Sequence, residues 1–140
     1  MIKFKEILCP TNLTPESDEG LRYGLALASA YGATLDLLYC ASGTEATAEL
    51  CGAARTNQYF GDSLAPHLAA YGSGRPDWEG IVVESLEDPG EEIVRVAAER
   101  SVDLIVMRSR RRPRAAALLG STAERVYRTA PCPVLITHER

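Results

Sequence analysis

The chain has 140 residues, a length that suits one ordinary domain with a buried core. Hydrophobic residues make up 46% of it and charged residues 24%, which is typical of a globular protein and excludes a disordered one. The formal net charge of −4 argues against a general nucleic-acid binder. We expect a single domain over residues 1–140.

No part of the sequence resembles a targeting or membrane segment. The first residues contain no apolar stretch of the kind that a signal peptide needs. Asp36 interrupts the longest apolar run, so no run reaches the roughly 18–20 apolar residues that span a bilayer. These features predict a cytoplasmic location and no membrane partner.

The cysteines and histidines are poorly spaced for a metal site. None of the cysteines forms a C-x-x-C pair, and His67 and His138 stand far apart. In a reducing compartment we expect the thiols to act as small hydrophobic side chains. Cys9 and Cys40 each end a predicted strand, and the sequence leaves open whether they are neighbours.

The first part of the chain alternates between strand and helix patterns. An apolar run at the end of Phe4–Pro10 predicts the first strand. Thr14-Pro15-Glu16 then predicts a helix start, since it places a hydroxyl cap before proline and an acid in the first turn. The helical spacing ends at Gly32, and Thr34–Cys40 predicts the second strand.

The pattern weakens between Ala41 and Glu79, where glycine and proline recur. We predict one helix within Ser63–Tyr71 and leave open a second around Thr44–Ala54. The short β-branched run Ile81–Val83 predicts the third strand.

Asp88-Pro89-Gly90-Glu91 is the clearest helix start in the chain, with a carboxylate cap and proline at the first helical position. The buried face of this helix is predicted to contain Ile93, Val96 and Ala97, and the fourth strand follows at Leu104–Met107.

A capping box at Ser121-Thr122-Ala123-Glu124 predicts the last helix, which Pro131 ends. Its predicted buried face consists of Ala123, Val126, Tyr127 and Ala130. Val134–Thr137 is the fifth strand. Strands and helices that alternate at this spacing predict an α/β fold: a doubly wound, open, parallel five-stranded sheet with helices on both faces.

In such a sheet the ligand crevice lies at the carboxyl ends of the strands. Three segments are predicted to end there: Pro10-Thr11-Asn12, Cys40-Ala41 and the loop from Arg108 to Gly120. The loop leads into Gly120-Ser121-Thr122 at a helix N-terminus, where free N–H groups and the helix dipole favour an anion.

Several of these motifs together resemble the universal stress protein family. The resemblance is carried by the opening Ile7–Pro15, by Asp88-Pro89 and by the stretches Leu104–Met107 and Gly120–Leu135. It implies the adenine nucleotide alpha hydrolase-like strand order 3-2-1-4-5. It also implies a homodimer formed through the last strand, at Val134, Leu135 and Ile136.

The resemblance further implies that nucleotide-binding members have an aspartate after the first strand and a loop of the form G-x-x-G-x9-G-[ST]. This chain departs from that pattern, because Asn12 takes the place of the aspartate, and Arg108 and Arg111 take the places of the first two glycines. The loop is also slightly shorter, and only Gly120-Ser121 is retained. Arginine removes the close backbone approach that glycine allows.

Two functions stay open from the sequence. The first is a non-catalytic, dimeric stress-response regulator with a degenerate nucleotide site. The alternative is a switch protein that binds ATP or another nucleotide through Gly120-Ser121 and the Arg108–Arg114 cluster, whose side chains can contact phosphate. That cluster also fits a solvated basic loop.

No positioned base or metal site is offered, so we expect no enzyme, although a weak ATPase stays open. We expect no nucleic-acid partner, because the arginines have no aromatic platform beside them. The candidate cofactor-binding residues are Pro10, Thr11, Asn12, Cys40, Arg108, Arg111, Gly120, Ser121 and Thr122.

Overall fold

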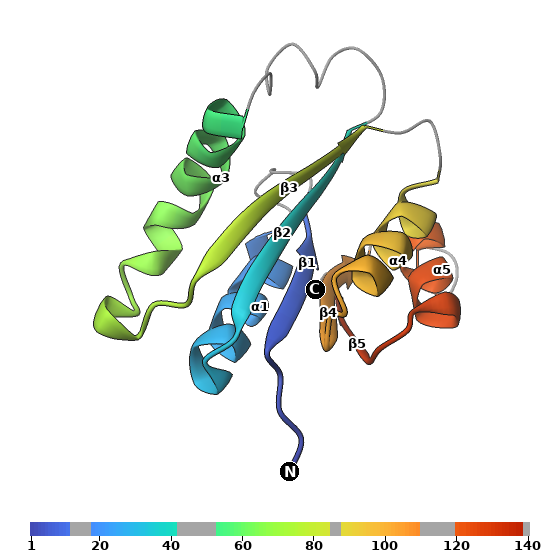
Figure 1. Ribbon diagram of the computed structural model, residues 1–140, viewed down its shortest axis with the longest axis horizontal. Coiled ribbons are helices and arrows are strands. Elements are labelled where there is room, and N and C mark those ends of the chain that lie inside the picture. The colour runs from blue at the N-terminus through green and yellow to red at the C-terminus, as the bar shows by residue number, and fades with distance from the viewer. Residues whose placement is uncertain (12–17, 42–52, 85–87, 110–119, 139–140) are drawn as a thin grey trace.

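The computed structural model describes residues 1–11, 18–41, 53–84, 88–109 and 120–138. Within them, five strands form one parallel sheet in the order β3-β2-β1-β4-β5 (Figure 1). This order and the doubly wound α/β class confirm the expectation. The strands are β1 Glu6–Pro10, β2 Thr34–Ala41, β3 Trp78–Glu84, β4 Leu104–Ser109 and β5 Val134–His138.

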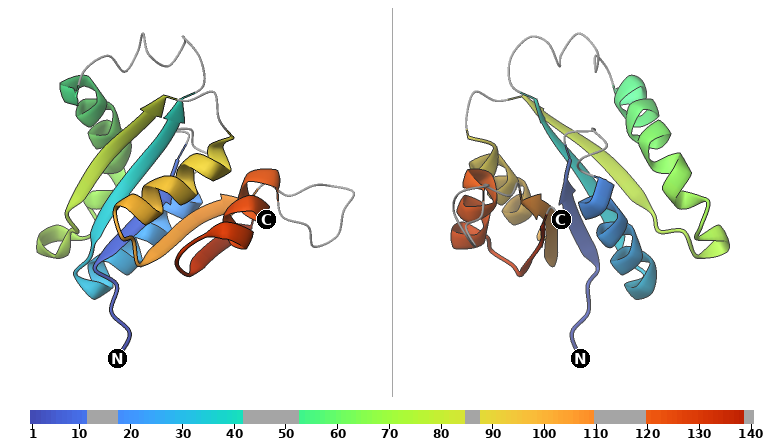
Figure 2. Two further views of the ribbon diagram at one scale, coloured as in Figure 1. Left: turned by 45° about the vertical axis from the view of Figure 1, so that its right-hand side comes forward. Right: turned by 180° about the vertical axis from the view of Figure 1, so that it is seen from behind.

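The helices cover both faces of the sheet. Figure 2 shows α4 and α5 over one face, with α1 and α3 over the other. The helical elements are α1 Asp18–Tyr31, α3 Ala53–Leu68, the short 3-10 helix η2 Gly72–Gly74, α4 Pro89–Glu99 and α5 Ser121–Thr129.

Each face of the sheet has its own hydrophobic core, and the strands contribute to both by alternation. Ile7 of β1 is buried on the side of α1 and α3, whereas Leu8 is buried on the side of α4 and α5. The pairs Leu37 and Leu38 of β2 and Val106 and Met107 of β4 divide in the same way. The uninterrupted apolar runs of the sequence therefore follow from a sheet that is covered twice.

The first predicted helix agrees with the structure in its described part. Leu21, Leu25 and Ala28 are all buried against the sheet. Gly32 has a φ of 64°, the left-handed conformation that commonly follows a helix end. The predicted start at Thr14 lies outside the described residues.

In the middle of the chain, the structure differs from the predicted helices. The helix predicted within Ser63–Tyr71 is α3, which begins ten residues earlier at Ala53 and ends at Leu68. It packs through the buried side chains Phe60, Leu64 and Leu68, which lie one helical turn apart. The other proposed helix, Thr44–Ala54, falls mostly outside the described residues.

The third strand is also longer than predicted, because it starts at Trp78 rather than Ile81. Gly80 lies inside it for a steric reason: a Cβ at this position would lie 2.3 Å from a ring carbon of Phe60. The glycine therefore makes room for the Phe60 ring of α3.

The two predicted helix caps have different outcomes. Asp88 caps α4 as expected, since its Oδ1 accepts the Gly90 N–H at 3.4 Å. The capping box at Ser121 is wrong, because the N-cap of α5 is Gly120 and Ser121 is already the first helical residue.

The predicted face of α5 is wrong at one position. Ala123 and Val126 are buried and Ala130 is partly buried, but Tyr127 is 67% exposed. In a helix this short, only a narrow stripe meets the sheet, and Tyr127 lies one position beyond Val126 on the solvent side.

Candidate functional site

A crevice of about 410 Å³ lies at the carboxyl ends of the central strands. It forms where β1 pairs with β2 on one side and with β4 on the other, which is the switch point of this sheet. The crevice is lined by Pro10, Thr11, Leu38, Tyr39, Cys40, Pro89, Ile93, Met107, Arg108, Ser109, Gly120, Ser121, Thr122 and Ala123.

Seven of the nine predicted site residues line this one crevice. Asn12 and Arg111 lie outside the described residues, as do the other arginines of the Arg108–Arg114 cluster beyond Arg108. The seven are Pro10, Thr11, Cys40, Arg108, Gly120, Ser121 and Thr122.

The sequence prediction missed the contribution of α4, whose first turn reaches the crevice through Pro89 and Ile93. A usable signal was present: the strong cap at Asp88 follows the third strand, and the N-terminus of a crossover helix lies at the carboxyl edge of its sheet. It also missed Ser109, two residues beyond the apolar run of the fourth strand.

Thr11 is held at the crevice by the backbone. Its N–H donates to the carbonyl of Leu38 at 2.8 Å, which continues the β1–β2 ladder one residue past the end of β1. The chain therefore enters the crevice with the orientation of the strand.

Ser109 joins the end of β4 to the start of α5. Its side chain is almost fully buried, and its Oγ accepts the Gly120 N–H at 2.9 Å. The Gly120 carbonyl in turn accepts the Glu124 N–H at 2.9 Å, the first hydrogen bond of α5. The next N–H groups, of Ser121, Thr122 and Ala123, have no acceptor within the helix and lie at the crevice.

Arg108 lies at the rim of the crevice. Alternation along β4 puts it on the same face as Leu104 and Val106, the face that α1 covers, whereas Met107 and Ser109 lie on the face of α4 and α5. Arg108 therefore reaches the crevice from the face that α1 covers.

Cys40 contributes a neutral thiol to the crevice. Burial, and secondly the nearby charge of Glu92, raise its pKa to about 11, while Arg95 opposes this effect. Cys9 is different, since burial alone raises its pKa to about 12. The two thiols are free and lie on opposite faces of the sheet, which answers whether they are neighbours.

The groups that line the crevice are suited to bind a ligand. Its polar groups are hydroxyls, backbone N–H groups, one protonated thiol and one guanidinium. Among the described residues, no three or more His, Cys, Asp or Glu side chains are grouped to hold a metal ion.

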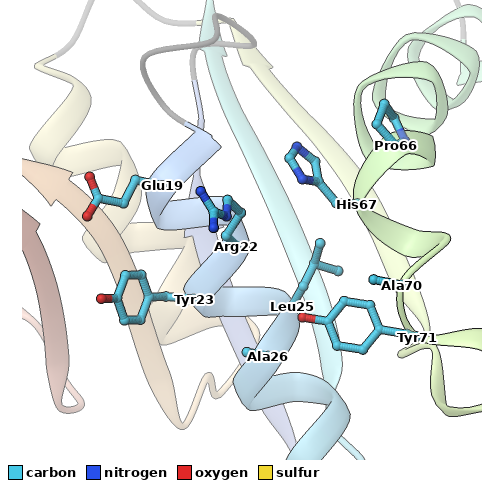
Figure 3. A pocket seen from close by; sticks show the side chains of 9 residues that line it. All are labelled: Glu19, Arg22, Tyr23, Leu25, Ala26, Pro66, His67, Ala70 and Tyr71. Atoms are coloured by element: carbon cyan, nitrogen blue, oxygen red, sulfur yellow. The ribbon is translucent and has the colours of Figure 1, made fainter.

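A larger hollow of about 710 Å³ lies on the other face, between α1 and the end of α3. Figure 3 shows His67 and Tyr71 pointing toward Arg22 and Leu25 of α1, while Tyr23 points away from them. It contains none of the predicted site residues, and none of the residues that line it belongs to a strand. The fold rule therefore favours the smaller crevice.

Within the described part of the chain, no helix has the length and apolar character needed to cross a membrane.

A family model described as "Universal stress protein family" matches residues 3–138. No curated protein matches the sequence.

Three similar solved structures extend this finding. A universal stress protein in complex with cAMP has 20% identity and a TM-score of 0.70, with 99% of this chain and 100% of that one covered. The universal stress protein UspA from Lactobacillus plantarum has 18% identity and a TM-score of 0.69, with 97% and 99% covered. A universal stress protein from Archaeoglobus fulgidus in complex with dAMP has 18% identity and a TM-score of 0.61, with 97% and 98% covered.

Proposed function

The chain belongs to the universal stress protein family, and on that premise we propose that it is a non-catalytic regulator that binds an adenine nucleotide in the crevice of β1, β2 and β4. The observation that carries this proposal is the convergence of seven predicted residues on a crevice of about 410 Å³ at the switch point of the sheet. The cytoplasm remains the expected compartment, because Cys9, Cys40 and Cys132 are free thiols.

The ligand class is supported by the similar structures and by the chemistry of the crevice. Two of those structures contain cAMP and dAMP, which share an adenine base, a sugar and a phosphate. The crevice offers apolar side chains such as Leu38 and Ile93 to a base. At its other side it offers the N-terminal N–H groups of α5 to a phosphate.

The competing function is a regulator with a degenerate site that holds no nucleotide. It rests on Asn12, Arg108 and Arg111, which replace the acid and the first two glycines of the family pattern. The geometry favours binding, because the N-terminus of α5 is open to the crevice.

Calorimetric titration with ATP, ADP, AMP and cyclic AMP, with and without Mg²⁺, tests the proposal. We expect saturable binding that Gly120→Val abolishes, because Val fits the extended backbone of Gly120 (φ −60°, ψ 159°) but adds bulk beside the phosphate. Gly74→Val is the matched control, since a Cβ there meets only the Ser29 Oγ at 3.8 Å. No binding of any of the four nucleotides would establish the degenerate site. Phosphate release above a buffer blank would contradict the non-catalytic role.

We also propose that the protein is a homodimer that pairs through β5. This strand is the last in the sheet order and pairs with β4 alone among the described strands. Leu135 is 37% exposed there, between the half-buried Val134 and Ile136. We expect Leu135→Lys to sediment as a monomer while Tyr127→Lys, on the exposed side of α5, stays dimeric. A monomeric wild-type protein would contradict the proposal.

A further inference from the structure

A cluster of acidic side chains lies at the amino end of the sheet, away from the crevice. Glu6 of β1, Asp36 of β2 and Glu79 of β3 come from three neighbouring strands and, by alternation, from the face that α4 covers. Asp36 is completely buried beside Leu8 and Leu38, whereas Glu6 and Glu79 reach solvent in part.

The guanidinium of Arg100 contacts all three carboxylates. Arg100 is the C-cap of α4, and its Nε lies 3.3 Å from Asp36 Oδ2 and 3.4 Å from Glu6 Oε1. Its Nη2 donates to Glu79 and lies 3.4 Å from Asp36 Oδ1. The shortest of these contacts goes to the exposed Glu79, and the contacts to buried Asp36 are long.

The charges in this cluster do not balance. Three ionised carboxylates against one guanidinium leave a net charge of −2. Asp103, the residue before β4, lies nearby, and its Oδ2 accepts the backbone N–H groups of Lys5 and Glu6. The residues of α4 nearest to Arg100 on the buried face, Val96 and Ala97, are apolar. A buried carboxylate in such a place is stabilised by taking up a proton.

We propose that Asp36 is a proton-binding site: below neutral pH it holds a proton, which it donates to Glu6, and this completes the attachment of the α4 C-terminus to the sheet. The proton lies in a hydrogen bond between the two carboxyl groups. With it bound, the cluster has a net charge of −1, and Arg100 faces two carboxylates instead of three.

The environment of Asp36 supports this assignment. Burial raises the pKa of Asp36 from 3.8 to about 7; the hydrogen bond with Glu6 and the charge of Glu6 act in the same direction, and Arg100 opposes them. Because the folded pKa lies above the unfolded one, the bound proton stabilises the fold fully below about pH 4. That stabilisation is lost as the pH rises through about 7.

The direct test is carbon-13 NMR of the carboxyl groups in the wild-type protein. We expect the Asp36 carboxyl carbon to titrate with a midpoint near 7. An Asp36 carbon that shows the ionised shift throughout the range from about pH 5 to 8 would overturn the proposal. This experiment needs no variant and is independent of whether the crevice binds a nucleotide.

Two variants should shift that midpoint in opposite directions. Glu6→Gln removes a negative charge and donates an amide hydrogen to Asp36, so we expect the midpoint to fall by on the order of one pH unit. Arg100→Gln removes the only cation of the cluster, so we expect the midpoint to rise. Equal midpoints in the two variants would contradict the assignment of the titration to Asp36, because Glu6 and Arg100 act on its pKa in opposite directions.

A stability measurement gives an independent test. The urea midpoint of the wild type should fall between about pH 6 and 8, whereas Asp36→Asn, which has no proton to lose, should lack this part of the fall. Asp62→Asn is the matched control, because Asp62 is exposed on α3 and its variant should keep the wild-type profile. An Asp36→Asn profile that is parallel to the wild type would contradict the proposal.

Discussion

The two ends of the sheet differ in how their polar groups are paired. At the carboxyl end, the first N–H groups of α5 lie in an open crevice, with apolar side chains opposite them. At the amino end, the carboxylates of three strands are gathered around the single guanidinium of Arg100. One end leaves hydrogen-bonding groups available to a ligand, and the other satisfies them within the chain. Helix α4 connects the two, since its first turn lines the crevice and its C-cap lies in the acidic cluster.

The largest change that we expect at either end comes from Arg100→Ala. Removal of the guanidinium leaves Asp36 buried without a counter-charge, which should lower the free energy of unfolding by about 3 kcal/mol at about pH 8. The loss should be smaller at about pH 6, where Asp36 holds its proton. Urea denaturation at the two pH values measures both losses. Equal losses would contradict the prediction that Asp36 holds a proton at about pH 6 and is ionised at about pH 8.

At the crevice end, Ser109→Ala should have the next largest effect. It leaves the Gly120 N–H without its acceptor, and we expect a loss of about 1–2 kcal/mol of unfolding free energy. Ser109→Thr keeps the hydroxyl and is the matched control. The affinity of the protein for a nucleotide should also fall in the alanine variant and recover in the threonine variant. An unchanged stability would show that Ser109 does not hold the start of α5.

The smallest expected effect compares the two ends of α4 directly. Asp88 accepts the Gly90 N–H at the helix start, and it also contacts Arg125 of α5. Asp88→Ala should cost about 1 kcal/mol, because the cap is exposed and water replaces it in part. The loss should not depend on pH between about 6 and 8, unlike that of Arg100→Ala. Thermal unfolding at both pH values provides the measurement, with Asp88→Asn as a variant that keeps a capping oxygen.

The sequence predicts most of the sheet and rather less of the site, for a physical reason. Strands and caps are local: the apolar run of β4 and the proline after Asp88 are read from a few adjacent residues. The extent of α3 is not local. Gly61 and Pro66 argue against a helix, but Gly61 lies against the Trp78 ring and Phe60 fits over Gly80. These contacts come from a strand that follows later in the chain.

The same distinction separates the site residues that were predicted from those that were missed. Ser121 has every local mark of a cap, yet the N-cap of α5 is one residue earlier, at Gly120. The N–H of Gly120 donates to Ser109, eleven residues before it. Asp36 looked only like an interruption in an apolar strand. Its partner Arg100 is 64 residues away, and no local pattern connects the two.

The hydrogen bond between Ser109 and Gly120 also has a consequence for the sequence between them, which becomes free to vary. Since the bond fixes where the chain leaves β4 and where it enters α5, residues 110–119 can change in length and composition while both anchor points stay in place. A chain with arginines and one fewer residue in this loop can then keep the helix start in register with the sheet.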